Sequence, residues 1–185
     1  MAYYALVHFP EINTRKIEEF RKKYDPHYKL ISAHIVIVFP VSDVVGESRL
    51  VNHIKNTLSE WKPFDICISG LKKSWDQWMF LVLQEGNSSI AKLHDELYTS
   101  LLSKYLRKDI KYIPHIGLGL FVKGAYNLKN PKKVPLDREK YSEALTKAKT
   151  LNFNYRVKVR KLHLVKLNNT FTKSSIVKEF LLNEI

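Results

Sequence analysis

Two short segments of this chain repeat one pattern, and that repeat constrains the fold more than any other feature. Residues 33–40 read AHIVIVFP, and residues 112–121 read YIPHIGLGLF. Each segment is a short apolar run of the kind that forms a buried strand, and each contains one histidine just before the run. His115 follows His34 by 81 positions in a chain of 185 residues. Two such strands indicate an internal duplication with one histidine in each half.

The alternation of side chains along a strand predicts which residues accompany each histidine. Successive side chains point to opposite faces of a sheet, so the second and fourth residues after a histidine share its face. In the first segment both of these residues are valines, and in the second both are glycines. We therefore expect two histidine-bearing faces that also carry Val36, Val38, Gly117 and Gly119.

The remaining pattern predicts an α+β fold. Apolar residues at helical spacing predict helices over residues 14–25, 48–61, 88–105 and from 137 onward. Apolar runs and alternating patterns predict further strands over 3–9, 64–71, 78–84, 153–159 and 176–182. The alternation slips at residues 160–161, which marks a bulge or a boundary between two strands. Because hairpins are present and a strict strand–helix–strand order is not, we expect antiparallel or mixed sheets in one domain over residues 1–185.

The charge of the chain favours a polyanionic partner. The formal net charge is +13, from 31 Lys and Arg residues against 18 Asp and Glu residues. The segment 123–173 holds 14 of the basic residues but only three acidic ones, and 122–135 is predicted to be a long basic loop that either binds a ligand or is mobile. A basic surface attracts nucleic acids and nucleotides, although it can equally be a solvated surface without a partner.

Cysteine content and the N-terminal residues bear on the cellular compartment. Cys67 is the only cysteine, so the chain has no disulfide framework and no cysteine-based metal site. The first residues lack the basic and apolar regions of a signal peptide, and no later run reaches membrane-spanning length. We expect a cytoplasmic protein without a membrane partner.

Two histidines facing a common groove are suited to acid–base chemistry. An imidazole has an unperturbed pKa of about 6.5, so one ring can accept a proton near neutral pH while the other donates one. Cleavage of a phosphate ester without a metal ion can use such a pair. The chain has no Gly-rich phosphate loop, no His-Glu-x-x-His and no Gly-x-Ser-x-Gly motif. Metal ligation by His34 and His115 is the alternative, but no carboxylate partner lies close to them in sequence.

Four segments carry a resemblance to a known family. They are RKKYDPHYKLISAHIVI (21–37), ELYTSLL (96–102), YIPHIGLG (112–119) and the closing stretch 162–182 that begins LHLVKL. With these segments the chain resembles the two-histidine (2H) phosphoesterase superfamily, which includes 2′-5′ RNA ligase-like proteins and cyclic phosphodiesterases. Within it, the chain is most similar to a branch of small, uncharacterised bacterial members.

The resemblance implies a fold, a catalytic pair and a substrate class. It implies a bilobal α+β fold with two pseudo-symmetric lobes, each an antiparallel sheet backed by helices, around a central cleft. It also implies that His34 and His115 are the catalytic residues of a phosphodiesterase that uses no metal or other cofactor. The implied substrates are 2′,3′-cyclic phosphates or 2′-5′ linkages of RNA ends or nucleotides, and we expect a monomer.

The chain departs from the family at two positions that contact substrate. The family has Thr or Ser two residues after each histidine, where the hydroxyl holds phosphate oxygens, whereas this chain has Val36 and Gly117. Loss of one such donor typically slows a reaction by about 10²–10³. Catalysis therefore needs other donors, and otherwise the protein is a catalytically weakened RNA- or nucleotide-binding module. The candidate donors are Lys72, Lys73, Tyr112 and Lys123.

Other residues have two interpretations that the sequence leaves open. Tyr112, with Tyr4 and Tyr28, can stack on a nucleobase or simply pack. His8 can line the groove or belong to the core, and His163 is expected to be structural. His27, His53 and His94 fall on predicted loops or helix surfaces and need no function.

Overall fold

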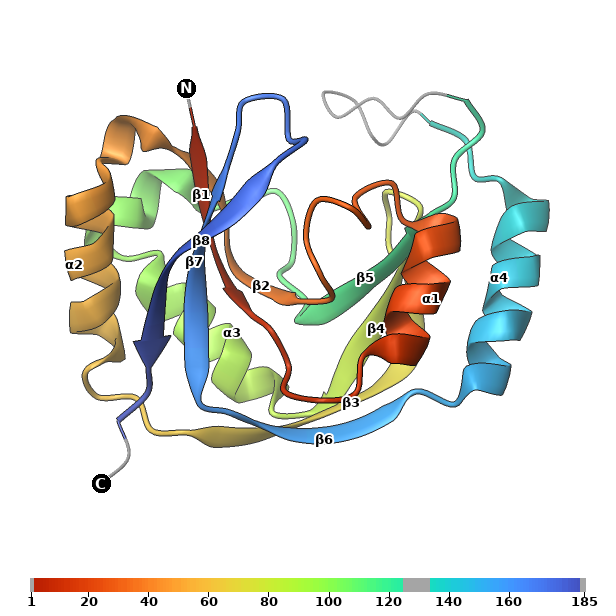
Figure 1. The fold of residues 1–185 in the computed structure, drawn as a ribbon, viewed down its shortest axis with the longest axis horizontal. Helices are drawn as coiled ribbons and strands as arrows, with labels where there is room; N and C mark the ends of the chain where they lie inside the picture. Colours follow the sequence, from red (N-terminus) through yellow and green to blue (C-terminus); the bar gives the residue numbers. More distant parts are fainter. Residues whose placement is uncertain (1, 125–133, 184–185) are drawn as a thin grey trace.

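The computed structural model describes residues 2–124 and 134–183, and within them eight strands form one curled antiparallel sheet (Figure 1). The order across the sheet is β6-β3-β4-β5-β2-β1-β7-β8. The strands are β1 (Tyr3–His8), β2 (Ile35–Ser42), β3 (Phe64–Lys73), β4 (Trp78–Glu85), β5 (His115–Leu120), β6 (Asn154–Val159), β7 (Lys161–Leu167) and β8 (Ser174–Leu181). The helices are α1 (Arg15–Tyr24), α2 (Glu47–Leu58), α3 (Asn87–Leu97) and α4 (Arg138–Leu151), with short 3-10 segments η1 (Asp43–Val45) and η2 (Ser100–Tyr105).

The sheet divides into two halves at the junction of β2 and β5. Strands β2, β1, β7 and β8 form the first half, and strands β5, β4, β3 and β6 form the second. Only one residue pair, Ile35 with Ile116, registers across the junction. Helix α1 packs on β5 and α3 packs on β2, so each covers a strand of the other half. The order β1-α1-β2-α2 is thus repeated as β4-α3-β5-α4, and the bilobal α+β expectation is confirmed.

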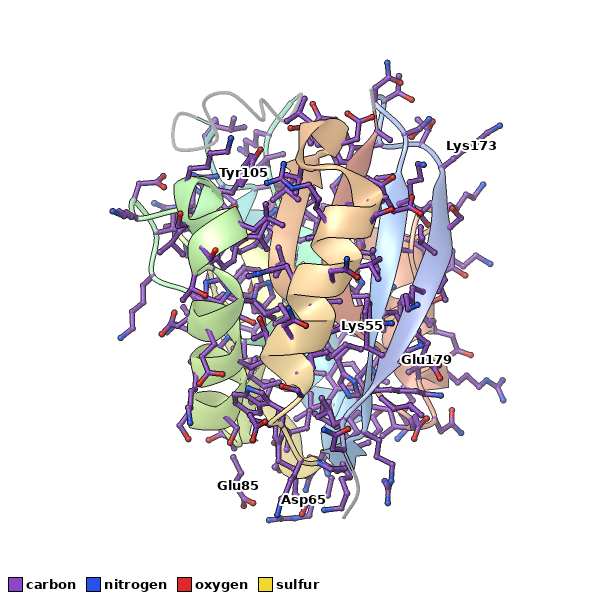
Figure 2. The ribbon with its side chains drawn as sticks, turned by 90° about the vertical axis from the view of Figure 1, so that its left-hand side faces the viewer. Lys55, Asp65, Glu85, Tyr105, Lys173 and Glu179 are labelled. Atoms are coloured by element: carbon purple, nitrogen blue, oxygen red, sulfur yellow. The ribbon has the colours of Figure 1, made fainter. Side chains whose placement is uncertain are left out.

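The helices cover one face of the sheet, which we call the helix-covered face. The main core lies between them and includes fully buried residues from every helix and from the central strands. Helices α2 and α3 lie side by side over the first half, and α1 and α4 lie over the second (Figures 1 and 2). We call the opposite side the open face. Representative core residues are Ile17, Phe20, Ile35, Leu50, Ile54, Leu81, Ile90, Leu93, Ile116 and Ala148.

Both histidine strands contain a bulge at the same place. Between β1 and β2 the register steps from Val7–Val36 to Leu6–Val38, which leaves Ile37 as the extra residue. Between β4 and β5 it steps from Phe80–Gly117 to Met79–Gly119, which leaves Leu118 as the extra residue. Each extra residue follows its histidine by three positions. An irregularity at one offset in both halves is what the predicted duplication requires.

These bulges overturn part of the face assignment made from alternation. An extra residue reverses the phase of a strand, so Val38 and Gly119 point to the helix-covered face while Val36 and Gly117 stay on the open face. Val38 is accordingly 2% exposed and belongs to the main core. A Cβ atom on Gly119 would lie 2.6 Å from Cβ of Tyr24, so α1 can approach β5 only because residue 119 is glycine.

Several predicted boundaries are corrected by the structure. The helix predicted over 48–61 ends at Leu58. The one predicted over 88–105 ends at Leu97 and is followed by η2, whose first residue, Ser100, has a positive φ of 47°. The slip at residues 160–161 is a strand boundary, since β6 and β7 lie in opposite halves of the sheet. Asp137 caps α4 through a bond from the Lys140 N–H, as predicted. Most of the predicted basic loop, with Lys129, Lys132 and Lys133, falls outside the described residues.

Candidate active site

The two histidines meet at the junction of the two halves. Ile35 of β2 lies directly opposite Ile116 of β5. Continuing this antiparallel register by one residue in each direction sets His34 opposite Gly117 and His115 opposite Val36. Residues directly opposed in an antiparallel pair have Cβ atoms about 4.5–5.5 Å apart. The predicted catalytic pair and the two predicted hydroxyl positions therefore form one cluster on the open face.

The two imidazoles are oriented by equivalent hydrogen bonds. Nδ1 of His34 lies 2.7 Å from the carbonyl oxygen of Ser32, and Nδ1 of His115 lies 2.6 Å from that of Ile113. In both cases the carbonyl belongs to the residue two positions earlier. Because a carbonyl oxygen only accepts, each Nδ1 carries the proton and each Nε2 keeps a lone pair. Neither Nε2 has a protein partner within residues 2–124 and 134–183. Each Nε2 is thus able to accept a proton.

Burial keeps both imidazole rings neutral at neutral pH in the free protein. Burial lowers the pKa of His34 and that of His115 to about 4, although both side chains retain some exposure. The nearby charges differ between the two: Arg21 lowers the pKa of His34 further, whereas the carboxylate of Asp76 raises that of His115. A bound phosphate is negative, so it raises both pKa values and favours a proton on one ring.

Aromatic side chains of β4 and of the loop after α1 surround the cluster. The ring of Phe80 stacks on His115 at a centroid distance of 3.5 Å and an angle of 21°. The indole of Trp78 lies 3.6 Å from the position that a Cβ atom of Gly117 would take, and it stacks with His27 at 5.8 Å. These contacts do not follow from the sequence pattern alone. The available signal is the pair of aromatic residues at alternate positions 78 and 80, opposite the apolar phase of Met79 and Leu81.

A buried ion-pair network supports the segment before His34. The guanidinium of Arg21 is 2% exposed and pairs with Asp25 at 2.8 Å and with Glu18 at 2.9 Å. It also donates to the carbonyl oxygen of Ile31 at 2.9 Å, while Glu18 accepts from the Ala33 N–H. The loop that ends at His34 is therefore held from both sides. The sequence signal is the i, i+3 and i, i+4 spacing of Glu18, Arg21 and Asp25, which the helix brings together.

The predicted substrate-binding residues divide between the two faces. Val36 and Gly117 lie on the open face beside the histidines, and Val36 packs against a second apolar cluster that includes Val7 and Ile31. The hydroxyl of Tyr112 donates to the carbonyl oxygen of Val36 at 2.7 Å, and its ring stacks on His94 at 3.8 Å. Tyr112 also packs against the main core, so the structure uses it to fix β2, and its contact with substrate stays a prediction.

Of the candidate replacement donors, Lys72 is on the open face next to the cluster. It is the cross-strand partner of Phe80, which in turn pairs with Gly117, so the three residues form one row across the sheet. The ammonium group of Lys72 has no protein partner in the part of the chain that the structure describes. Lys73 is already bonded to the Ser74 carbonyl and to Gln77. No contact among the described residues relates the Lys123 side chain to the cluster.

The other histidines have structural surroundings. His8 is fully buried and bonds the Lys161 carbonyl, which places it in the core. The expectation that His94 lies on a helix surface is wrong, because its side chain is 2% exposed and bonds the Ile37 carbonyl. His163 lies 3.1 Å from Glu179.

The described residues offer neither a cluster of metal ligands nor a membrane-spanning helix. Within residues 2–124 and 134–183, no three His, Cys, Asp or Glu side chains are grouped so that they could hold a metal ion. None of the helices in that same part of the chain is long and apolar enough to cross a membrane.

Comparison with solved structures supports the fold. LigT of Escherichia coli in its apo form superposes with a TM-score of 0.63 at 15% identity, covering 99% of this chain and 97% of that one. A protein of Thermus thermophilus also superposes with a TM-score of 0.63, at 17% identity and with 98% and 97% coverage. At these identities the likeness concerns the fold alone.

Comparison of sequences adds the family. A protein of Geobacillus kaustophilus named "Putative phosphoesterase" is 27% identical over 128 residues, which cover 66% of this chain and 71% of that protein. A protein of Geobacillus thermodenitrificans with the same name is 25% identical over 148 residues, covering 77% and 83%. The family model of the 2′-5′ RNA ligase superfamily matches residues 9–170, which include both histidine strands and everything between them. The chain therefore belongs to the 2′-5′ RNA ligase superfamily.

Proposed function

We propose that this protein is a phosphodiesterase that hydrolyses 2′,3′-cyclic phosphates or 2′-5′ linkages of RNA ends or nucleotides, with His34 and His115 as the acid–base pair. The observation that carries the proposal is the matched pair of imidazoles, each bonded through Nδ1 and each free at Nε2 on the open face. Membership of the superfamily supports phosphodiesterase-type activity. LigT, which shares the fold, has been crystallised with 3′-AMP, and this supports a nucleotide as the ligand here.

The proposed reaction needs one neutral and one protonated imidazole. The neutral ring takes a proton from water as its oxygen forms a bond to phosphorus. The bond from phosphorus to the leaving sugar oxygen breaks, and the protonated ring donates its proton to that oxygen. The two rings exchange protonation states, and solvent restores them. Because the pair supplies both proton transfers, the proposed reaction requires no metal ion.

The surroundings of the two rings support separate roles for hydrolysis. Arg21 disfavours the charged form of His34, which suits a base that must be neutral at the start. Asp76 favours the charged form of His115, and the face of the Phe80 ring is a favourable contact for a cation. We assign His34 as the general base and His115 as the general acid.

Lys72 is the proposed source of charge stabilisation for the phosphate. The hydroxyl contacts of the family are absent, since neither Val36 nor Gly117 can donate from a side chain. Gly117 has no side chain beside His34, and Lys72 lies in the same row of the sheet with its charge uncompensated by any described residue. A lysine that extends over Phe80 can place an ammonium group near the phosphate oxygens.

The lost hydroxyls also favour a second candidate function. If Lys72 does not compensate for them, the protein binds RNA or nucleotides without turnover. A variant that restores one hydroxyl tests whether its loss limits turnover. Val36→Thr conserves the shape of the side chain and restores the hydroxyl next to His115. We expect it to raise turnover if the missing donor limits the rate.

The deciding experiment uses purified protein in EDTA with 2′,3′-cyclic nucleotides and a 2′-5′-linked dinucleotide. We expect product with the wild type and none with the His34→Ala, His115→Ala double variant. Circular dichroism of both proteins controls for folding. Binding that weakens steeply with salt but gives no product at any pH would reject the enzyme and favour the binding module.

A further inference from the structure

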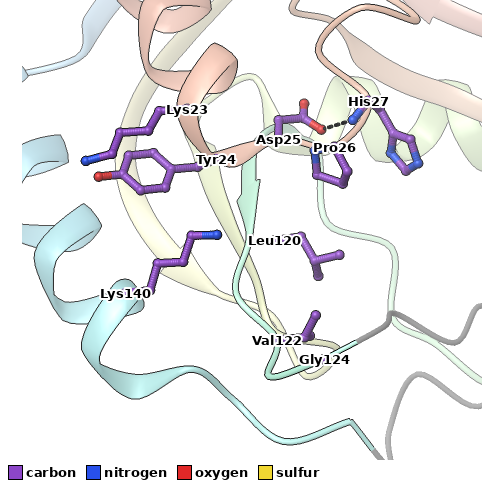
Figure 3. A pocket seen from close by; sticks show the side chains of 9 residues that line it. All are labelled: Lys23, Tyr24, Asp25, Pro26, His27, Leu120, Val122, Gly124 and Lys140. Atoms are coloured by element: carbon purple, nitrogen blue, oxygen red, sulfur yellow. Dashed lines mark hydrogen bonds between the residues drawn. The ribbon is translucent and has the colours of Figure 1, made fainter.

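A second pocket opens at the far end of β5, outside the histidine cluster. It has a volume of about 490 Å³ and lies between the C-terminal end of α1, the end of β5 and the start of α4 (Figure 3). Its polar wall comes from Lys23, Tyr24, His27 and Lys140, and its apolar wall includes Leu120 and Val122. The proposed reaction uses none of these residues.

Contacts on the open face connect this pocket to the histidines. Leu120 of the pocket is the cross-strand partner of Trp78, and His27 of the pocket stacks on the Trp78 ring. The same indole contacts the space above Gly117, which lies opposite His34. Gly117 and Leu120 lie opposite Phe80 and Trp78, which are two residues apart on β4, a separation of roughly 7 Å along a strand. One nucleoside can span this distance, so a ligand at the histidines can reach the pocket.

The charges in the pocket are unevenly compensated. The carboxylate of Asp25 is directed at Arg21 and at the His27 N–H, and Glu143 pairs with Lys23 at 2.7 Å and with the Tyr24 hydroxyl at 3.2 Å. Lys140 projects from α4 toward the middle of the pocket (Figure 3), and its ammonium group has no protein partner in the described residues. The acidic groups are therefore already neutralised, and one cation is available for an anionic ligand.

We infer that this pocket is a second anion subsite, which binds a phosphate one nucleoside away from the phosphate held by the histidine pair. The His27–Trp78 stack lines the path between the two sites and contacts the nucleoside that joins them. The second phosphate can be the 5′-phosphate of a nucleotide or the next phosphodiester of an oligonucleotide. The inference rests on the proposed function for the identity of the first site.

Binding of reaction products tests this subsite without requiring turnover. Calorimetric titration at fixed salt compares adenosine 2′-phosphate with adenosine 2′,5′-bisphosphate and with a dinucleotide that ends in a 2′-phosphate. We expect the second phosphate to tighten binding to the wild type by roughly tenfold. Lys140→Gln should abolish this advantage and leave the affinity for adenosine 2′-phosphate unchanged. Lys55→Gln is the matched control, because it removes one charge from α2 on the other side of the molecule (Figures 1 and 2).

The outcomes separate this inference from the proposed function. Equal affinities for all three ligands in the wild type, or an advantage that survives Lys140→Gln, would overturn the subsite. An advantage confined to the bisphosphate identifies a terminal 5′-phosphate as the ligand group, and one confined to the dinucleotide identifies an internal phosphodiester. A protein without turnover in EDTA that still shows the Lys140-dependent advantage would lose the proposed function and keep the subsite.

Discussion

The two halves of this molecule share the backbone of a site but differ in what surrounds it. Each half presents a histidine at the start of a strand, a bond from its Nδ1 to the carbonyl two residues earlier, and a bulge three residues later. The matched features position two imidazoles, and they do so through the backbone. The shared backbone features therefore orient both rings in the same way, although the flanking side chains differ.

The flanking residues distinguish the halves. Val7 and Phe80 occupy corresponding places, as cross-strand partners of Val36 and Gly117. In the first half, Leu30 and Ile31 pack with Val7 in an apolar cluster, whereas in the second half Phe80 stacks on His115 and Trp78 connects the face to the pocket. Equal geometry with unequal surroundings supports different roles for the two histidines in the proposed reaction.

Replacement of either histidine should have the largest effect on activity, and it tests whether both halves take part in the reaction. We expect His34→Gln and His115→Gln each to lower kcat/KM by about 10³, within the range of general acid–base catalysis. The double variant should be little worse than either one, because the two residues act as a unit. Circular dichroism and urea unfolding of each variant verify that the loss is chemical.

The pH profile distinguishes the two roles. A base is inactivated when it is protonated, which produces the acid limb, and an acid is inactivated when it loses its proton, which produces the alkaline limb; the two apparent pKa values belong to the coupled pair. Both pKa values are lowered to about 4 in the free protein, so kcat/KM should peak on the acid side of pH 6.5, the ordinary imidazole value. Bound phosphate raises them, so kcat should peak at higher pH. Residual activity of His34→Gln that retains the acid limb would reverse our assignment.

Arg21 tests the ion-pair network that supports the segment before His34. Arg21→Met leaves the buried carboxylate of Asp25 without its cation, and removal of one partner of a buried pair typically costs about 3–5 kcal/mol. We expect a loss near the lower end, measured by urea unfolding, because Glu18 keeps some contact with solvent. The control is Lys22→Met on the exposed side of α1, with an expected change within about 0.5 kcal/mol. Equal effects of the two variants would show that the network does not hold the His34 loop.

Alanine substitutions of the two glycines of β5 test directly whether the bulge places them on opposite faces of the sheet. Neither has a positive φ, so the difference between them lies in space and not in backbone conformation. Gly119→Ala places a Cβ atom 2.6 Å from Tyr24 and should cost about 1–3 kcal/mol of unfolding free energy. Gly117→Ala meets only the Trp78 ring at an ordinary 3.6 Å and should change stability by less than about 0.5 kcal/mol. Similar costs would mean that both glycines share a face, as simple alternation predicts.

The bulges also explain what the sequence could and could not reveal. The repeat of His-Ile identified the two strands and the pair of candidate residues, because one polar residue at the start of an apolar run is conspicuous. It did not show the bulges, since Ile37 and Leu118 are apolar and stand among residues that are mostly apolar on both faces. The hydrophobic pattern carries no mark of a phase reversal there.

Contacts between segments that are distant in the chain are the second feature that the sequence did not reveal. Glu18, Arg21 and Asp25 are adjacent on one helix, so their pairing follows from spacing, but their bonds to the segment before His34 depend on how the loop folds back. Trp78 and Phe80 were correctly placed on a hairpin strand. Their position over Gly117 and His115 depends on the pairing of β4 with β5, which no local pattern specifies.

Phe80→Leu tests the difference between the halves that should have the smallest effect, which is the stacking of the Phe80 ring on His115. Leucine keeps an apolar side chain beside the ring but removes the π face, a contact worth about 0.5–1.5 kcal/mol, so we expect kcat to fall by roughly two- to thirteenfold. Since the face of Phe80 favours the charged imidazole, the alkaline limb should move to lower pH while the acid limb stays in place. Val82→Ala is the control, because Val82 is the cross-strand partner of His115 and has no π face. A uniform loss of kcat with both limbs unmoved would mean that Phe80 only packs against His115, and the assignment of His115 as the acid would then rest on Asp76 alone.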